Sequence, residues 1–134
     1  MAKPLDEQYR AISDQVEQVA GKAVAVATLE VLGELKHRTP VDTGHARSNW
    51  IPAAGAPYRA VEPGSAGAAQ AVGEVAIATG RVAKTFISNN VPYIQRLDQG
   101  HSQQAPTGFV RQSVFTGLAR ARAKITAMLK RVGS

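Results

Sequence analysis

The first third of the chain carries a long apolar stripe at helical spacing. Its members recur at alternating steps of four and three residues and so share one helix face: Leu5, Tyr9, Ile12, Val16, Val19, Ala23 and Val26. The stripe breaks at Glu30, and the apolar residues within 31–35 point elsewhere. Because residues before a proline avoid the α region, Thr39-Pro40 ends the helix. We therefore expect one helix from Leu5 to about Arg38.

A second long helix is expected at the other end of the chain, over residues 109–131. Its predicted apolar face consists of Val110, Val114, Leu118, Ala121, Ile125 and Met128. These residues follow one another at steps of three or four, which is the spacing of one helix face. Basic residues occupy the rest of the circumference, so this helix is long, amphipathic and basic.

The middle of the chain predicts short elements. A turn is expected at 40–44, an extended segment at 45–51 closed by Pro52, a loop at 53–67 that is mobile in part, and a short Ala-rich helix at 65–78. A strand follows at 81–88, then a turn and one helical turn within 91–99. Two long helices flanking a small antiparallel sheet predict an α+β fold in a single domain, 1–134.

The net charge of +6 is concentrated at one end of the chain. Up to Asp98 the ten basic and ten acidic residues balance, and no acid follows Asp98. The excess is supplied by Arg111, Arg120, Arg122, Lys124, Lys130 and Arg131. Such asymmetry marks contact with nucleic acid or an acidic partner. It is equally typical of a solvated helix end, where cations are favoured.

Composition excludes several classes of protein. The chain has no cysteine, which excludes disulfides and thiolate metal sites. No apolar run approaches the roughly 20 residues that span a bilayer, and the N-terminal residues lack the apolar core of a signal peptide. We expect a soluble protein made in the cytoplasm, without membrane contact.

The titratable residues do not form a recognisable active site. None of the three histidines, His37, His45 and His101, recurs at a spacing that makes a metal-binding face. Asp98 and His101 could touch, which leaves a small hydrolase as a remote alternative. Asp42, His45 and Ser48 hold triad residue types, but alternation along a strand would place them on different faces. We expect no enzyme activity, no metal and no cofactor.

Residues 87–111 contain an unusually high number of turn-forming residues, which stand between apolar residues. Asn90, Pro92, Gly100, Pro106 and Gly108 alternate with Tyr93, Ile94, Leu97 and Phe109. This pattern fixes a loop by turns and packing, and fixed surface loops usually serve recognition. A plain connector between a strand and a helix would need fewer constraints and would be shorter.

Two patches of this sequence resemble a known family. The first is Thr39-Pro40-Val41-Asp42-Thr43-Gly44, followed by Arg47, Asn49 and Trp50; the second is Asn89-Asn90, Pro92-Tyr93, Asp98, Gly100, Ser102, Ala105-Pro106, Gly108 and Arg111. In this order they resemble the tail-component family of long-tailed bacteriophages related to the tenth gene product of phage HK97. The match covers about 35–50 and 86–114. Asp98 stands where glutamate is more common, and Phe109 where methionine is.

The resemblance implies a structural virion protein of the head–tail junction, a neck or tail-completion subunit. Such subunits form rings, often hexamers, around the DNA channel, and they contact neighbouring neck and tail proteins. The implied contact residues are Asp42, Thr43, Trp50, Asn90, Pro92, Tyr93, Asp98, Pro106 and Phe109, while the six basic residues would face DNA or an acidic partner. The resemblance is equally compatible with an adaptor, a stopper, a tail terminator or a completion protein. The alternative is a nonspecific nucleic-acid-binding protein that uses the basic helix.

Overall fold

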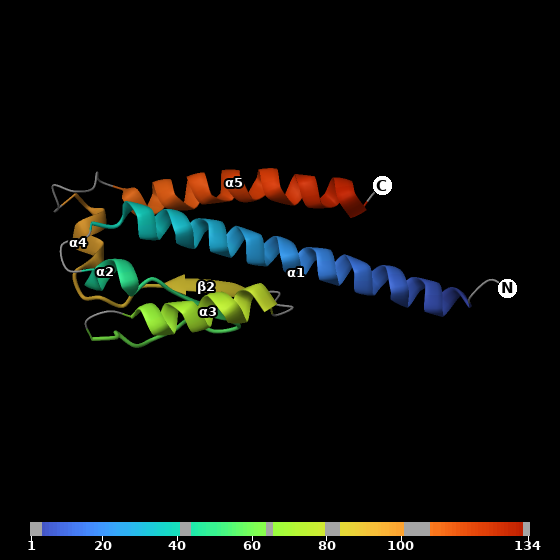
Figure 1. Cartoon of the computed structure of the whole chain (residues 1–134), viewed down its shortest axis with the longest axis horizontal. Coiled ribbons are helices and arrows are strands. Elements are labelled where there is room, and N and C mark those ends of the chain that lie inside the picture. The colour runs from blue at the N-terminus through green and yellow to red at the C-terminus, as the bar shows by residue number, and fades with distance from the viewer. Residues whose placement is uncertain (1–3, 41–43, 64–65, 80–83, 101–107, 133–134) are drawn as a thin grey trace.

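The computed structural model describes residues 4–40, 44–63, 66–79, 84–100 and 108–132. Within these ranges the elements follow in the order α1 (Leu5–Arg38), α2 (His45–Ser48), β1 (Ile51–Ala54), α3 (Gly67–Thr79), β2 (Thr85–Ser88), α4 (Ile94–Asp98) and α5 (Phe109–Val132) (Figure 1). A long helix at each end, a small antiparallel sheet and a short middle helix confirm the predicted α+β fold.

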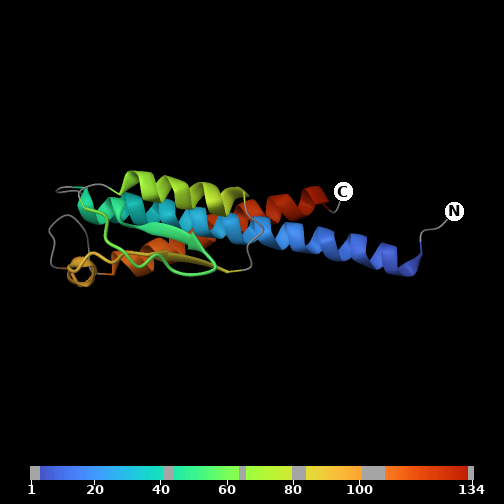
Figure 2. The same ribbon diagram turned by 90° about the horizontal axis from the view of Figure 1, so that it is seen from below.

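Small side chains bring α1 and α5 together as an antiparallel pair (Figures 1 and 2). At Gly117 a Cβ atom would lie 2.6 Å from the Cα of Val31, so the two backbones are almost in contact there. Ser113 and Ala121, one turn to either side of Gly117, are also buried. The seam therefore depends on residues that occupy little space.

Ion pairs line one edge of the α1–α5 seam. Arg120 Nε lies 2.9 Å from Glu34 Oε1, and Lys124 pairs with Glu30. Glu30 occupies the position where the N-terminal apolar stripe breaks. It faces the basic residue Lys124 of α5, because the stripe side of α1 turns toward α5 in the body of the molecule.

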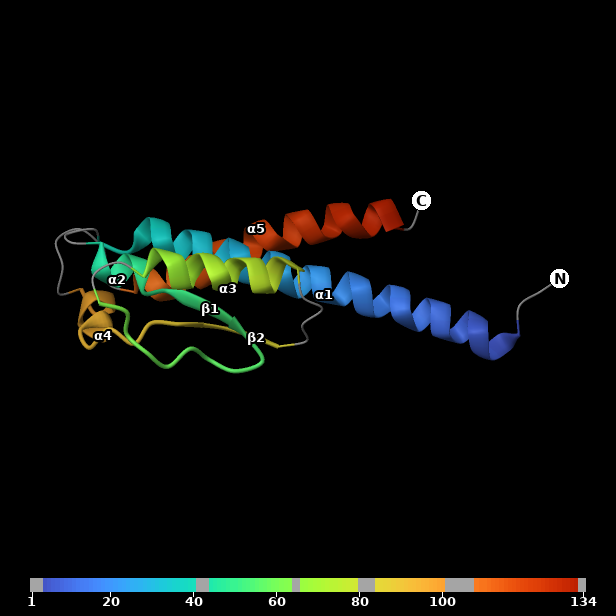
Figure 3. The ribbon, with the colours of Figure 1, turned by 60° about the horizontal axis from the view of Figure 1, so that its bottom comes forward.

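The helix α3 lies directly on the strand β1 (Figure 3). A Cβ atom at Gly73 would lie 2.1 Å from the carbonyl oxygen of Pro52, so only glycine permits this approach. Nearby, Gln70 Nε2 donates to the carbonyl oxygen of Trp50 at 2.9 Å. On its other side β1 pairs antiparallel with β2, with Pro52 opposite Ile87.

The core lies where α1 ends and α5 begins. It consists of Val31, Leu32, Leu35, Trp50 and Phe109. Trp50 satisfies its indole N–H by donating to Thr39 Oγ1 at 2.8 Å, as a buried tryptophan requires.

The prediction of an extended segment at 45–51 is wrong for most of its length. His45–Ser48 forms α2, which is too short to show a helical period in the sequence, and β1 begins only at Ile51. Pro52 does not close the strand but lies inside it. Gly55 N–H donates to Lys84 O, which by alternation turns the nitrogen of Pro52 away from β2. Proline therefore removes no ladder bond there.

The predicted apolar face of the last helix is only partly right. Ala121 is buried, whereas Val114 and Leu118 are 39% and 49% exposed. The side that meets α1 instead runs through Phe109 and Ser113, which are fully buried.

The N-terminal half of α1 extends beyond the end of α3, and its first turns also extend beyond the end of α5 (Figures 1 to 3). Its apolar residues are left uncovered: Leu5, Tyr9, Ile12 and Val16 are 61–82% exposed. Across the described residues, no helix is apolar over a length that could span a bilayer.

Candidate functional site

The two sequence patches meet at one end of the molecule. Asn89, after β2, donates its side-chain N–H to the carbonyl oxygen of Ala46 in α2 at 2.8 Å. The side-chain oxygen of Asn89 accepts the N–H of Val91 at 3.1 Å, which fixes the turn. A single side chain thus joins segments that are 43 residues apart.

Asn90 and Ser88 fasten the middle loop to the same end. Both side chains donate to the carbonyl oxygen of Tyr58, Asn90 Nδ2 at 2.8 Å and Ser88 Oγ at 3.0 Å. Asn90 also reaches Ala60 O at 3.3 Å. The two consecutive asparagines therefore hold different segments: Asn89 binds α2, and Asn90 binds the middle loop.

Asn49 holds the loop from the other side. Its side chain is buried and exchanges two hydrogen bonds with the backbone of Glu62, accepting at 2.9 Å and donating at 3.2 Å. The described part of 53–67, a segment expected to be partly mobile, is thus tied to both patches.

A surface pair closes the loop on itself. Tyr58 Oη donates to the carboxylate of Glu62. This hydrogen bond, together with partial desolvation and the negative charge of Glu62, raises the pKa of Tyr58 above its ordinary value of 10.0. The bond requires the phenolic proton. It is therefore present while the pH lies below the raised pKa of Tyr58, and it is lost as the pH rises through that pKa.

Three of the predicted contact residues reach the surface at this end. Pro92 and Asn90 are exposed, and Tyr93 is 40% exposed. The ring of Tyr93 lies 6.3 Å from that of His45, measured between centroids. Pro92 and Tyr93 are therefore available to a neighbouring molecule.

Two other predicted contact residues are part of the core. Trp50 is 6% exposed and Phe109 is fully buried. In the folded chain their side chains pack against α1, so little of either reaches the surface. Their contact with a neighbouring subunit stays a prediction. Asp42, Thr43 and Pro106 lie outside the described residues.

Asp98 fastens the start of α5. Its Oδ1 accepts the N–H of Val110 at 3.0 Å, and its carbonyl oxygen accepts the N–H of Gly108 at 2.7 Å. An acceptor on the first N–H groups of a helix is a capping contact. Asp98 thus closes the base of the segment between α4 and α5, a role in folding.

The six basic residues do not share one face of α5. Arg120 and Lys124 turn toward α1 and pair with Glu34 and Glu30. Arg111 and Arg122 are exposed, and at 100° per residue they lie together on the opposite, outer side. Lys130 and Arg131 are exposed near the end of the helix.

The sequence predicted the apolar stripe of α1 as one helix face, but it did not predict that the N-terminal part of the stripe would be exposed. The signal for its exposure was present, since the stripe breaks at Glu30 and the next apolar residues lie on another face. The core uses Val31, Leu32 and Leu35, whereas the stripe is exposed from Leu5 to Val16 and half-buried beyond that.

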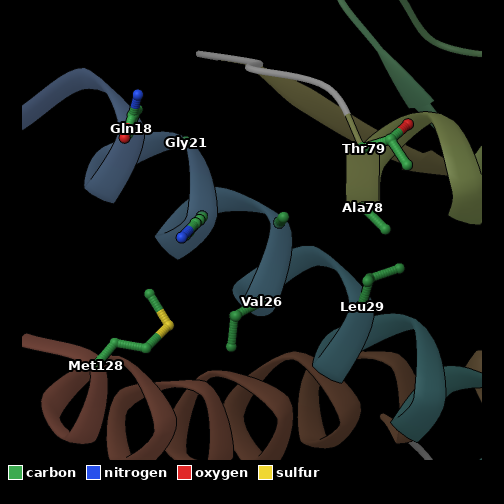
Figure 4. Close-up of a pocket in the computed structure, with 9 residues that line it drawn as sticks. Gln18, Gly21, Val26, Leu29, Ala78, Thr79 and Met128 are labelled. Atoms are coloured by element: carbon green, nitrogen blue, oxygen red, sulfur yellow. The ribbon is translucent and has the colours of Figure 1, made fainter. Parts of the chain in front are cut away.

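A groove of about 570 Å³ opens where α1 leaves the body (Figure 4). It lies between α1, α3 and α5, and it is lined by Gln18, Gly21, Lys22, Ala25, Val26, Leu29, Ala78, Thr79 and Met128. Gly21 and Ala25 leave the α1 wall shallow. In Figure 4, Met128 reaches from α5 toward Val26 and forms the α5 wall of the groove.

The triad residue types that are described have structural tasks. Ser48 Oγ donates to the carbonyl oxygen of His45 at 3.2 Å and accepts the N–H of Ala66 at 3.0 Å. His101, the partner considered for Asp98, lies outside the described residues. Among the described residues, no group of three or more potential ligands is placed to hold a metal ion.

Comparisons of the chain with protein-family models, with curated proteins and with solved structures find no match.

Proposed function

We propose that this chain is a structural subunit of a bacteriophage head–tail junction, a neck or tail-completion protein that assembles as a ring around the DNA channel. The observation that carries the proposal is the uncovered stripe on α1, with side chains 61–82% exposed. Contiguous apolar surface of this kind marks a site of protein association. A subunit that assembles with copies of itself would cover it.

The arrangement of the two sequence patches supports the same proposal. Asn89 and Asn90 hold the second patch against α2 and the middle loop, and this leaves Pro92 and Tyr93 exposed. A rigid, hydrogen-bonded end with two exposed apolar residues is suited to recognition. The order of the patches is the order by which the sequence resembles the phage tail-component family.

The proposal includes the partners. The subunits would form a homo-oligomeric ring, a hexamer, and bind neighbouring neck and tail proteins within the virion after assembly in the host cytoplasm. In a cyclic ring each subunit offers two different faces to its neighbours. The adaptor, stopper, terminator and completion positions all fit this description.

The test is to locate the subunit in particles. We expect electron microscopy of virions that carry a tagged copy to place it at the junction, and particles without the protein to accumulate unjoined heads and tails. The exposed pair Pro92→Ala and Tyr93→Ala should fold normally but fail to restore joining. A matched change at exposed Val72, outside both patches, should restore it. Complete particles without the subunit would overturn the proposal.

The exposed arginines on the outer side of α5 favour a second candidate, nonspecific nucleic-acid binding. A true binder of DNA loses affinity steeply with salt, with a slope set by the number of phosphates contacted. If this function is correct, Arg111→Ser with Arg122→Ser should reduce both the affinity and the slope. Binding that is unchanged in this double variant would exclude the α5 surface.

A further inference from the structure

The uncovered part of α1 is acidic as well as apolar. Residues 5–19 contain four acids and one base, Arg10, so their net charge is −3. The apolar members Leu5, Tyr9, Ile12 and Val16 lie within about 40° of one line along the helix at 100° per residue. A partner for this surface must therefore be apolar along a line and positively charged beside it.

The outer side of α5 has that character. Val114, Leu118 and Leu129 are 39–51% exposed, and their spacing places them beside Arg111 and Arg122. No acid follows Asp98 anywhere in the chain, so the positive charge of this face is undiluted. Among the described residues, the side chains of α1 that pair with α5 reach Gln112, Thr116, Arg120 and Lys124, away from Arg122.

We propose that the N-terminal half of α1 in one copy packs along the outer side of α5 in a second copy. The inference rests on the proposed function, since it names the contact that would build the ring. The lengths agree: the stripe from Leu5 to Val16 spans about 17 Å and the α5 face from Val114 to Leu129 about 23 Å, at 1.5 Å per residue.

Charge favours this pairing over a symmetric one. Two α1 halves packed on each other would bring together two segments of charge −3, and two α5 faces would bring arginines together. Like charges at an interface are unfavourable, and opposite charges steer association. The contact of α1 with α5 joins two different surfaces, and when it runs in one direction from copy to copy it produces a ring or a chain.

Cysteine cross-linking of the full chain tests the contact directly, because the chain has no cysteine of its own. Ile12→Cys is combined with Leu118→Cys, and in a second variant with Leu129→Cys. Within one copy, Gly117 faces Val31, so its neighbour Leu118 lies almost 20 residues along α1 from Ile12. A link between Ile12 and Leu118 must therefore join two copies, and in the Leu129 variant only the linked species larger than a monomer count. A short bismaleimide linker is used, since it tolerates a looser geometry than a disulfide.

We expect a ladder of linked dimers, trimers and larger species from at least one double variant. Each single variant should give no ladder. The matched control is Ile12→Cys with Val72→Cys, because Val72 is 71% exposed but lies on α3. It should give no ladder either.

Three results would overturn the inference. These are monomers alone in both double variants, equal ladders in the Val72 control, or dimers from Ile12→Cys alone, which would mean that two α1 helices pair. If the subunit is found at the junction in particles but no ladder forms, the proposed function stands and this contact fails. If a ladder forms but the protein is absent from the junction, this contact stands and the proposed function fails.

Discussion

Asp98 shows how one residue can serve the fold while it stands in a motif that suggests recognition. Its side chain accepts the N–H of Val110 in the first turn of α5, and its carbonyl oxygen accepts the N–H of Gly108. The sequence predicted the importance of this position but not its task, because the partner N–H of Val110 lies 12 residues away.

We expect Asp98→Ala to lower the free energy of unfolding by about 1 kcal/mol, the usual cost of losing a capping side chain. Asp98→Asn keeps an acceptor and should lose much less. Thermal and urea unfolding followed by circular dichroism measure both. An alanine variant as stable as the parent protein would show that the cap contributes nothing.

The asparagines make the same point about long-range bonds. Their turn-forming character at 89–90 could be predicted from composition and position. Their acceptors, Ala46 O and Tyr58 O, could not, since these atoms are brought close only by the pairing of β1 with β2. The burial of Asn49 likewise depends on where the middle loop folds back.

Among the elements, the contact between α1 and α5 gives the sharpest test. Gly117→Ala places a methyl group 2.6 Å from Val31 Cα, so the helices must separate. We expect this to lower the free energy of unfolding by about 1–3 kcal/mol, the usual cost of overpacking. Alanine's higher helix propensity, worth up to about 1 kcal/mol, opposes this loss only in part.

Gly33→Ala is the matched control, because nothing lies within 4 Å of a Cβ atom at this exposed position of α1. It should stabilise the protein by up to about 1 kcal/mol through helix propensity alone. Denaturant unfolding measures both variants. Equal shifts in the two variants would argue against close packing at Gly117.

The elements differ in how well the sequence predicts them. The long helices and α3 were predictable because each is long enough to show a period or a helix-forming composition. The four residues of α2 show no period. The buried side of α5 was not predictable from apolarity. Its contact with α1 is made by Ser113 and Gly117, whose small side chains let the two helices approach closely.

At the scale of the whole molecule, the same charge reversal should have different effects on the two sides of α5. Arg120→Glu places two carboxylates together, one of them the Glu34 side chain that is only 10% exposed. We expect a loss of about 1 kcal/mol in the free energy of unfolding, since the pair is partly screened by water. Arg122→Glu, on the outer side, should leave unfolding unchanged.

The two variants should differ again in association. Arg122→Glu should weaken self-association in sedimentation velocity at low salt, whereas Arg120→Glu should affect it only as far as the fold is weakened. Salt should reduce the association of the parent protein, because exposed charges are screened within about 10 Å at 0.1 M. Association that is indifferent to salt and to Arg122 would contradict the role given to charge.

The unbroken course of α1 has a mechanical consequence. One helix of 34 residues, about 51 Å long, carries both the exposed stripe and the core residues Val31, Leu32 and Leu35. The helix is therefore a rigid rod that is held in the core at one end and free at the other. A tilt imposed on its free end by an adjoining copy would be delivered to the sheet and to α5 without a joint to absorb it. In a closed ring of such rods, one subunit could not tilt without tilting the next, so the central opening would widen or narrow as a unit.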